Sequence, residues 1–276
     1  MLILQILLAV FLLPVIAVFL LGKYVDFRLA RKDFSDVYDD CHKVWTARGI
    51  YGDGVDENSI ESIGHAFAEG ALGVEVDVFY DVALNDFIVS HNFPYQLKNG
   101  RILPLSELFD ALGDGHYFWL DFKKLRRLTK TQALQAVQRL QQISQKNQLH
   151  ERIYVEGETP INLAHFRKAG FHTIFDTHPA PSGGMLAAAM ITLYKIFFYF
   201  GEHSVMGMEY GELDWPVYGA ATRKRLGRTP VFLYHVPVDE ALLDELLGIE
   251  AVRAFIVGNN QSVNFYHKNA CGQSEQ

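Results

Sequence analysis

The feature that most constrains the fold is an alternation of short apolar runs with longer helical patterns. Eight apolar runs have the length of buried strands, and seven helical patterns lie between them. Buried parallel strands joined by helices are typical of α/β proteins, and eight such units close most naturally into a (β/α)8 TIM barrel. An open doubly wound sheet is the alternative, but no glycine-rich phosphate loop follows the first strand. The predicted strands are His42–Ala47, Gly73–Val78, His116–Phe122, Arg152–Glu156, His172–Asp176, Ser204–Glu209, Val231–His235 and Ala254–Val257, with an extra run at Phe87–Ser90; the predicted helices are Ser59–Glu69, Leu105–Leu112, Thr131–Asn147, Pro160–Ala169, Met185–Phe200, Pro216–Leu226 and Asp239–Leu247.

The first 21 residues are almost wholly apolar and are interrupted only by Gln5 and Pro14. A stretch of about 20 apolar residues can span a bilayer as a helix. A cleaved signal peptide is the alternative, but it requires a basic start and a small-residue cleavage site, and no Lys or Arg precedes Lys23. The sequence therefore predicts a transmembrane anchor over 1–22, a juxtamembrane linker over 23–35, the barrel over 36–268 and a polar tail over 269–276.

The distribution of basic residues around the apolar stretch predicts on which side of the membrane the barrel lies. Four basic residues follow the apolar stretch and none precedes it, so the positive-inside rule predicts a single-pass anchor with the barrel in the cytoplasm. The net charge of −7 argues against nucleic acid as a partner. Cys41 and Cys271 have no metal-binding spacing and leave the compartment open.

Polar residues stand at the carboxyl end of nearly every predicted strand. The active sites of (β/α)8 barrels lie at this end, in the loops that follow the strands. Any one polar strand end is ordinary, because strands run into solvated loops, but a succession of them indicates a site. The residues are Arg48, Glu75, Asp77, Asp121, Lys123, Glu156, Asp176, Glu209, His235 and Asn259, together with His91 after the extra run.

Glu75 and Asp77 are the most informative of these residues. Residues i and i+2 of a strand point to the same face, so the two carboxylates converge. They repel each other unless a cation or a shared proton lies between them, and hard divalent cations take oxygen ligands of this kind. The alternative is that the two acids are exposed at a solvated strand end. The neighbouring Arg48-Gly49 and His91 argue against this alternative.

Five short motifs, taken in order, resemble the glycerophosphodiester phosphodiesterase family. They are Arg48-Gly49, Glu57-Asn58-Ser59, Glu75-Val76-Asp77-Val78, Ser90-His91-Asn92 and Asp121-Phe122-Lys123. The resemblance implies a barrel related to the phosphatidylinositol-specific phospholipases C. It also implies metal-dependent hydrolysis of glycerophosphodiesters or lysophospholipid-like phosphodiesters.

The resemblance assigns a role to each matching residue. Glu75, Asp77 and Asp121 would hold a divalent metal ion, Ca²⁺ or Mg²⁺. Arg48 and Lys123 would bind the phosphate and take part in catalysis, and His91 would be a general acid or base.

One departure from the family pattern bears directly on activity. Ala47 stands where the family has the first histidine of its His-Arg-Gly motif, and Asn92 follows His91 where the family has Asp. Because alanine cannot transfer a proton, the chain is either an enzyme that uses another group or a phospholipid or phosphodiester binder without turnover. His235 is the candidate replacement and a candidate substrate-binding residue.

The helix predicted over Met185–Phe200 carries a single charge, Lys195. An outer barrel helix normally has one apolar stripe, whereas this one is apolar nearly all round. A deeply buried helix or an oligomer contact would explain this pattern. An interfacial helix that enters lipid near the site mouth would also explain it and, with the anchor, predicts a lipid or lysolipid substrate at a membrane.

Overall fold

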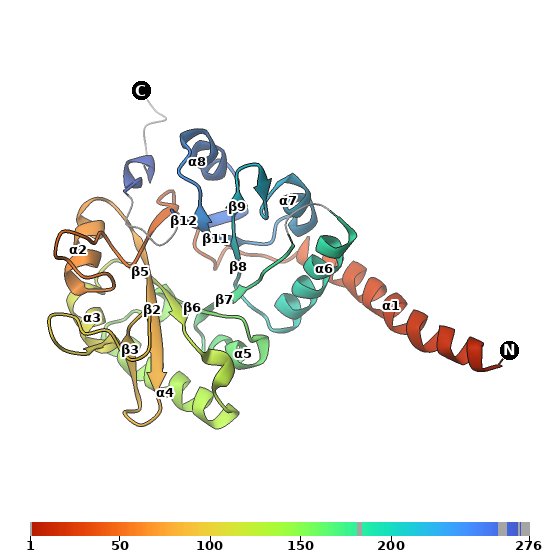
Figure 1. Ribbon diagram of the computed structural model, residues 1–276, viewed down its shortest axis with the longest axis horizontal. Helices are drawn as coiled ribbons and strands as arrows, with labels where there is room; N and C mark the ends of the chain where they lie inside the picture. Colours follow the sequence, from red (N-terminus) through yellow and green to blue (C-terminus); the bar gives the residue numbers. More distant parts are fainter. Residues whose placement is uncertain (1, 181–183, 259–263, 270, 272–276) are drawn as a thin grey trace.

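Eight parallel strands form a closed barrel. The computed structural model describes residues 2–180, 184–258, 264–269 and 271, and for residues 2–12 only the backbone. The strands are hydrogen-bonded in the order β1-β12-β11-β8-β7-β6-β5-β2, and pairing of β1 with β2 closes the ring (Figure 1). The predicted (β/α)8 architecture is therefore confirmed. The strands are β1 (Val44–Ala47), β2 (Gly73–Asp81), β5 (Tyr117–Phe122), β6 (Ile153–Gly157), β7 (His172–Asp176), β8 (Val205–Glu209), β11 (Val231–Val236) and β12 (Val252–Val257).

Helices surround the barrel, and three of them begin at a residue whose side chain caps the helix. Ser59 forms a capping box with Ser62, Thr129 forms one with Gln132, and the Asp239 side chain accepts a hydrogen bond from the backbone N–H of Leu242. The helices are α2 (Ile60–Ala68), α3 (Leu105–Leu112), α4 (Lys130–Lys146), α5 (Pro160–Lys168), α6 (Met185–Phe200), α7 (Ala220–Leu226) and α8 (Glu240–Leu247), with short 3₁₀ turns η1 (Leu125–Arg127), η2 (His150–Arg152) and η3 (Tyr266–Asn269).

Two hairpins depart from the simple alternation. β2 continues past the barrel, and β3 (Asp86–Val89) returns antiparallel to it and then pairs with β4 (Leu103–Pro104), so the extra predicted run belongs to a hairpin. The backbone N–H of Ser90 donates to the carbonyl of Asp77 (3.0 Å), which brings the following loop back to the end of the barrel strands. A small hairpin of β9 (Gly211–Glu212) and β10 (Trp215–Pro216) occupies the predicted start of α7, which begins at Ala220 instead.

Large aromatic side chains fill the barrel interior. The Phe232 ring lies 5.0–5.3 Å from the rings of Trp45, Trp119 and Tyr154, and these four side chains are at most 1% exposed. A Cβ at Gly73 would lie 2.2 Å from the Trp45 ring, so only glycine leaves room for the indole there. This packed interior confines any site to the carboxyl ends of the strands.

Helix α1 (Leu2–Leu29) packs against α6 and leaves the barrel beside it (Figure 1). The helix continues through the first part of the predicted linker. A Cβ at Gly22 would lie 2.6 Å from the Thr192 methyl group, so the helices approach closely. Lys195, the single charge of α6, is 9% exposed, pairs with Asp26 of α1 (2.5 Å) and donates to the carbonyl of Arg225 (2.7 Å). Contact with both the barrel and α1 accounts for part of the apolar surface of α6.

Over the residues whose side chains are described, the structure contains no helix that is both long enough and apolar enough to cross a membrane.

A disulfide joins Cys41, before β1, to Cys271, after η3, across 230 positions of sequence. The Asn269 side chain supports the same junction: its Oδ1 accepts from the Val44 N–H (2.8 Å) and its Nδ2 donates to the Val44 carbonyl (2.9 Å). The predicted polar tail otherwise lies largely outside the described residues. The two ends of the barrel are thus held together covalently and by hydrogen bonds.

Replacing Cys41 and Cys271 together with Ala is expected to lower the free energy of unfolding by about 2–5 kcal/mol. The disulfide restricts the unfolded chain over a very long loop, and its removal releases that restriction. Denaturant unfolding of the oxidised wild type and the double variant measures the difference, and reduced wild type serves as the control that should match the variant. Equal midpoints for all three would contradict the prediction.

Candidate active site

Three carboxylates meet at the carboxyl ends of two neighbouring strands. Glu75 and Asp77 come from β2 and Asp121 from β5, where Asp77 and Asp121 are register partners. Each of the three offers an oxygen that lies within 4.8 Å of the others. Glu75 is 7% exposed and Asp77 is fully buried. The structure therefore brings together the three residues predicted as metal ligands.

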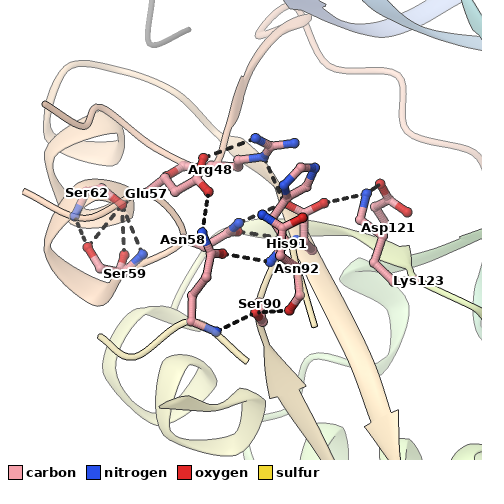
Figure 2. A network of polar contacts seen from close by, with 12 residues as sticks. Arg48, Glu57, Asn58, Ser59, Ser62, Ser90, His91, Asn92, Asp121 and Lys123 are labelled. Carbon is pink, nitrogen blue, oxygen red and sulfur yellow. Dashed lines mark hydrogen bonds and ion pairs between the residues drawn. The ribbon is translucent and has the colours of Figure 1, made fainter. Parts of the chain in front are cut away.

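Asp77 is the centre of a polar network; Figure 2 labels its partners Arg48, Asn58 and Lys123. Its Oδ2 lies 2.7 Å from Arg48 Nε and accepts a hydrogen bond from Asn58 Nδ2 (2.7 Å), while its Oδ1 lies 2.6 Å from Lys123 Nζ. Lys123 also pairs with Asp121. Burial raises the pKa of Asp77, but Lys123 and Arg48 outweigh burial and hold the pKa below its usual value. Asp77 is therefore a fixed anion that positions both cations.

Glu75 is in a different environment from Asp77. Among the described residues its carboxylate has no hydrogen-bond or ion-pair partner, although it lies in the wall of a cavity. Burial raises its pKa, and repulsion from Asp77 and Asp121 raises it further. Burial also raises the pKa of Asp121, to about 6, against the opposing effect of Lys123. An unpaired buried carboxylate beside two others fits a divalent cation, whose charge would relieve the repulsion.

The affinity for Ca²⁺ or Mg²⁺ is expected to rise between pH 5 and pH 8. The pKa of Asp121 is raised to about 6, so at pH 5 Asp121 holds a proton that a cation must displace, and at pH 8 it does not. The raised pKa of Glu75 adds competition from a proton in the same direction. Each displaced proton contributes roughly a tenfold gain in affinity per pH unit below the pKa. Calorimetric titration at several pH values measures this slope, with Asp86→Asn, whose carboxylate pairs with Arg139 away from the cavity, as the control. An affinity that does not change with pH would contradict the prediction.

The backbone conformation, as well as the chemistry of the site, explains the Arg48-Gly49 motif. Arg48 has a φ of 60° and Gly49 a φ of 85°, and a Cβ at Gly49 would lie 2.3 Å from the Ser62 backbone. The turn directs the Arg48 guanidinium toward Asp77 and toward Glu57 Oε2 (3.0 Å). A strained left-handed conformation at a non-glycine residue is typical of functional sites.

The Glu57-Asn58-Ser59 motif supports the site through three separate contacts. Glu57 holds the Arg48 guanidinium, Asn58 donates to Asp77, and Ser59 caps α2. The sequence identified this motif only by resemblance. Its positioning role becomes visible only when β1, β2 and α2 are seen together.

His91 reaches the site from the loop after β3. Its backbone N–H donates to the side-chain oxygen of Gln96 (3.1 Å), and Ser90 Oγ donates to the Asn92 carbonyl (2.8 Å), so the loop is well defined. Burial lowers the pKa of the His91 ring, which favours the neutral form able to accept a proton. The structure thus places His91 beside Arg48 and Lys123 in the same cavity wall (Figure 2).

The site opens into a cavity of about 530 Å³ at the carboxyl ends of the strands. Ala47 lies in its wall, and its register partner on β2 is Glu75. His235 also lines the cavity, with a left-handed φ of 52° and its Nδ1 3.6 Å from Glu209 Oε1. Burial lowers the pKa of His235, and Glu209 opposes that shift. The predicted residues that line the cavity are Arg48, Glu75, His91, Asp121, Lys123, Glu156, Asp176 and His235, whereas Asp77 lies behind them and Asn259 lies outside the described residues.

Several cavity residues were not singled out from the sequence. The Trp119 side chain packs in the barrel interior and donates from its indole N–H to Glu156 Oε2 (2.7 Å). The Tyr234 hydroxyl donates to Asp176 Oδ1 (3.1 Å), and His178 Nε2 lies 3.2 Å from Asp176 Oδ2. The turn after β5 adds a basic edge. The sequence signal that could have identified these residues is their position close to the end of a predicted strand. The additional lining residues include Tyr51, Lys124, Arg126, Arg127, Glu158 and Tyr234.

The fold and the site define a (β/α)8 barrel with a carboxylate-lined cavity at the carboxyl ends of its strands. Solved structures of glycerophosphodiester phosphodiesterases have this same barrel fold. The enzyme from Parabacteroides distasonis is 19% identical with a TM-score of 0.58, over 79% of this chain and 93% of that one. The Thermotoga maritima enzyme is 16% identical (TM-score 0.55; 78% and 93%), and the Agrobacterium tumefaciens enzyme is 12% identical (TM-score 0.51; 79% and 96%).

No protein-family model matches the sequence, and no curated protein matches it. At these identities the structural likeness shows the fold, and the argument for activity depends on the residues of the site.

Proposed function

We propose that this chain is a phosphoric diester hydrolase that cleaves glycerophosphodiesters or lysophospholipid-like phosphodiesters. One observation carries the proposal. Three converging carboxylates, two cations and a histidine lie together at one cavity, on the barrel fold of the solved glycerophosphodiester phosphodiesterases. Each group suits one part of phosphodiester cleavage: metal binding, phosphate binding and proton transfer.

The site residues divide the chemistry among them. Glu75, Asp77 and Asp121 would hold Ca²⁺ or Mg²⁺, which when bound offsets the charge that develops on the phosphoryl group. Arg48 and Lys123 bind the phosphate oxygens, Arg48 through its planar guanidinium. His91, neutral near pH 7 because burial lowers its pKa, accepts or donates a proton at the reacting oxygen, and His235, which lines the same cavity, contacts the substrate.

The proposal includes a membrane location. The apolar sequence from Met1 to Leu21 is the basis for a single-pass anchor that brings the barrel to a lipid bilayer.

Two observations disagree about which side of the membrane the barrel occupies: the basic flank favours the cytoplasm, whereas disulfides persist in oxidising compartments. We give the disulfide more weight, because it is a specific contact of the barrel and the flank is short. Alkylation of free thiols before cell lysis measures the paired fraction, and a fully reduced pair would return the barrel to the cytoplasm.

A second candidate function is binding of a phospholipid or phosphodiester without turnover. The observation that favours it is Ala47, whose methyl group lies in the cavity wall beside Glu75 and can transfer no proton.

Metal titration and hydrolysis together separate the two functions. Asp77→Asn keeps the shape of the side chain but removes its charge, so it is expected to weaken divalent-ion affinity and to abolish hydrolysis of glycerophosphocholine and related diesters. Asp86→Asn, a carboxylate of the β3 hairpin that pairs with Arg139, is the matched control. Metal binding by wild type without release of glycerol phosphate from any diester would support the binder, and unchanged metal affinity in Asp77→Asn would remove Asp77 as a ligand.

A further inference from the structure

The exposed apolar side chains of the barrel are concentrated on the rim that carries the cavity. Loops after β3, β6, β7, β8 and β11 all contribute large side chains that are at least half exposed. On the opposite rim, the comparable side chains among the described residues are Phe200 at the end of α6 and Phe27 near the end of α1. The site-rim set, as we define it, is Phe93 (64%), Leu97 (56%), Ile161 (75%), Met185 (92%), Leu186 (68%), Leu213 (51%), Trp215 (60%) and Val238 (53%).

Basic residues accompany this set. Lys124, Arg126 and Arg127 follow β5 and line the cavity edge. Lys124 Nζ lies 4.8 Å from the centre of the Phe93 ring, so a cation and an exposed aromatic ring form one projecting pair. Apolar side chains beside cations suit the boundary between lipid head groups and acyl chains, although in the β9–β10 hairpin the exposed Glu212 and Asp214 flank Leu213.

The direction of α1 points to the same rim. Gly22 lies opposite Thr192, and Arg28 lies over the Tyr199 ring (5.7 Å), so α1 and α6 run in the same direction where they pack. Helix α6 follows β7 and therefore begins at the site rim. The apolar part of α1 that precedes Gly22 thus lies on the site-rim side of this contact, and its exposed residues include Leu13, Val15, Phe19 and Leu20.

We propose that the site rim docks on the surface of a lipid bilayer, so that the cavity opens onto the head groups. The asymmetry between the two rims, the basic edge and the direction of α1 all favour a lipid surface over another occupant. Docking would have a consequence for catalysis, namely that the phosphodiester enters the cavity from the membrane and not from bulk water. This consequence rests on the proposed function. An anchor alone would leave the cavity free to face water.

Trp215 provides a direct test. Trp45 and Trp119 are each 1% exposed inside the barrel, whereas Trp215 is 60% exposed on the rim. The full-length chain is reconstituted into vesicles of phosphatidylcholine with an anionic lipid, with or without bromine on the acyl chains. Bromine is expected to quench the Trp215 component of the emission, and Trp215→Phe should lose this quenching while keeping the emission of the buried pair. Equal emission in both kinds of vesicle would overturn the proposal.

A second copy of the chain is the competing occupant of the rim. Emission from Trp215 that depends on protein concentration in detergent, with no quenching by brominated lipid, would assign the surface to self-association and overturn the proposal.

Turnover separates rim docking from the proposed chemistry. The double variant Leu213→Ser/Trp215→Ser is expected to cleave a vesicle-borne lysophospholipid about tenfold more slowly, because two interfacial side chains are lost, with unchanged cleavage of soluble glycerophosphocholine. Leu134→Ser, at a 40% exposed position on α4, is the matched control. Equal slowing on both substrates would overturn the rim's role. If wild type cleaves neither substrate, the proposed function fails, and the bromine measurement still decides the docking.

Discussion

Lys123→Met is expected to abolish most phosphodiester cleavage while leaving metal binding intact or tighter. Lys123 lies between Asp77 and Asp121, and both carboxylates raise its pKa against the effect of burial, so it is charged throughout the working pH range. Loss of one preorganised group that stabilises developing charge typically costs about 10²–10³ in rate. The same loss frees two carboxylates for a divalent ion. Opposite changes in turnover and metal affinity would therefore mark Lys123 as a phosphate-binding cation.

Lys124→Met is the matched control for this experiment. Lys124 carries the same charge one residue later, but its Nζ lies over the Phe79 and Phe93 rings and not among the carboxylates. Its replacement should leave cleavage of soluble diesters nearly unchanged. Steady-state kinetics and calorimetric titration of both variants give the comparison. Lys123→Met activity within a few-fold of wild type would contradict the assignment.

Ala47→His is expected to raise cleavage of glycerophosphodiesters. The position lies in the cavity wall next to Arg48 and Glu75, where an imidazole could reach the bound phosphate. One well-placed proton-transfer group typically contributes about 10²–10⁴-fold, and a misplaced group contributes much less. The pH dependence of turnover should also gain a step near the pKa of the new histidine.

Ala47→Gln controls for added polar bulk, because it fills similar space without transferring a proton near pH 7. If wild type is already active and Ala47→His slows it, another base operates, and His235→Ala should then remove most of the remaining activity. His235 has the geometry for this role, since its strained backbone holds the ring at the cavity beside Glu209. If neither wild type nor Ala47→His turns over a diester that nevertheless binds, the binding function is the correct one.

The barrel could be predicted from sequence because its signals are local. Each buried strand is a short apolar run, and predicted helix starts such as Ser59 and Asp239 carry capping side chains. The meeting of Glu75, Asp77 and Asp121 at one rim could be predicted because the strand ends of a barrel lie together. Their assignment as metal ligands came from the family resemblance.

Features that depend on contacts between distant segments could not be predicted. The sequence did not decide whether the apolar surface of α6 is buried in the protein or enters lipid, because no residue near Lys195 in the sequence shows that Asp26 pairs with it. The Cys41–Cys271 pairing spans nearly the whole barrel and leaves no local pattern. The start of α7 was placed too early because the β9–β10 hairpin depends on tertiary pairing and not on propensity.

The covalent link between the ends of the barrel has a practical consequence for engineering. The Cα atoms of Cys41 and Cys271 are 5.5 Å apart, so a short peptide linker could join these ends in a circularly permuted chain. New termini at the exposed Asp114-Gly115 turn, on the rim opposite the cavity, would leave Glu75, Asp77 and Asp121 in their strands. Such a permutant would contain the complete catalytic rim without α1, so its chemistry could be studied apart from the membrane.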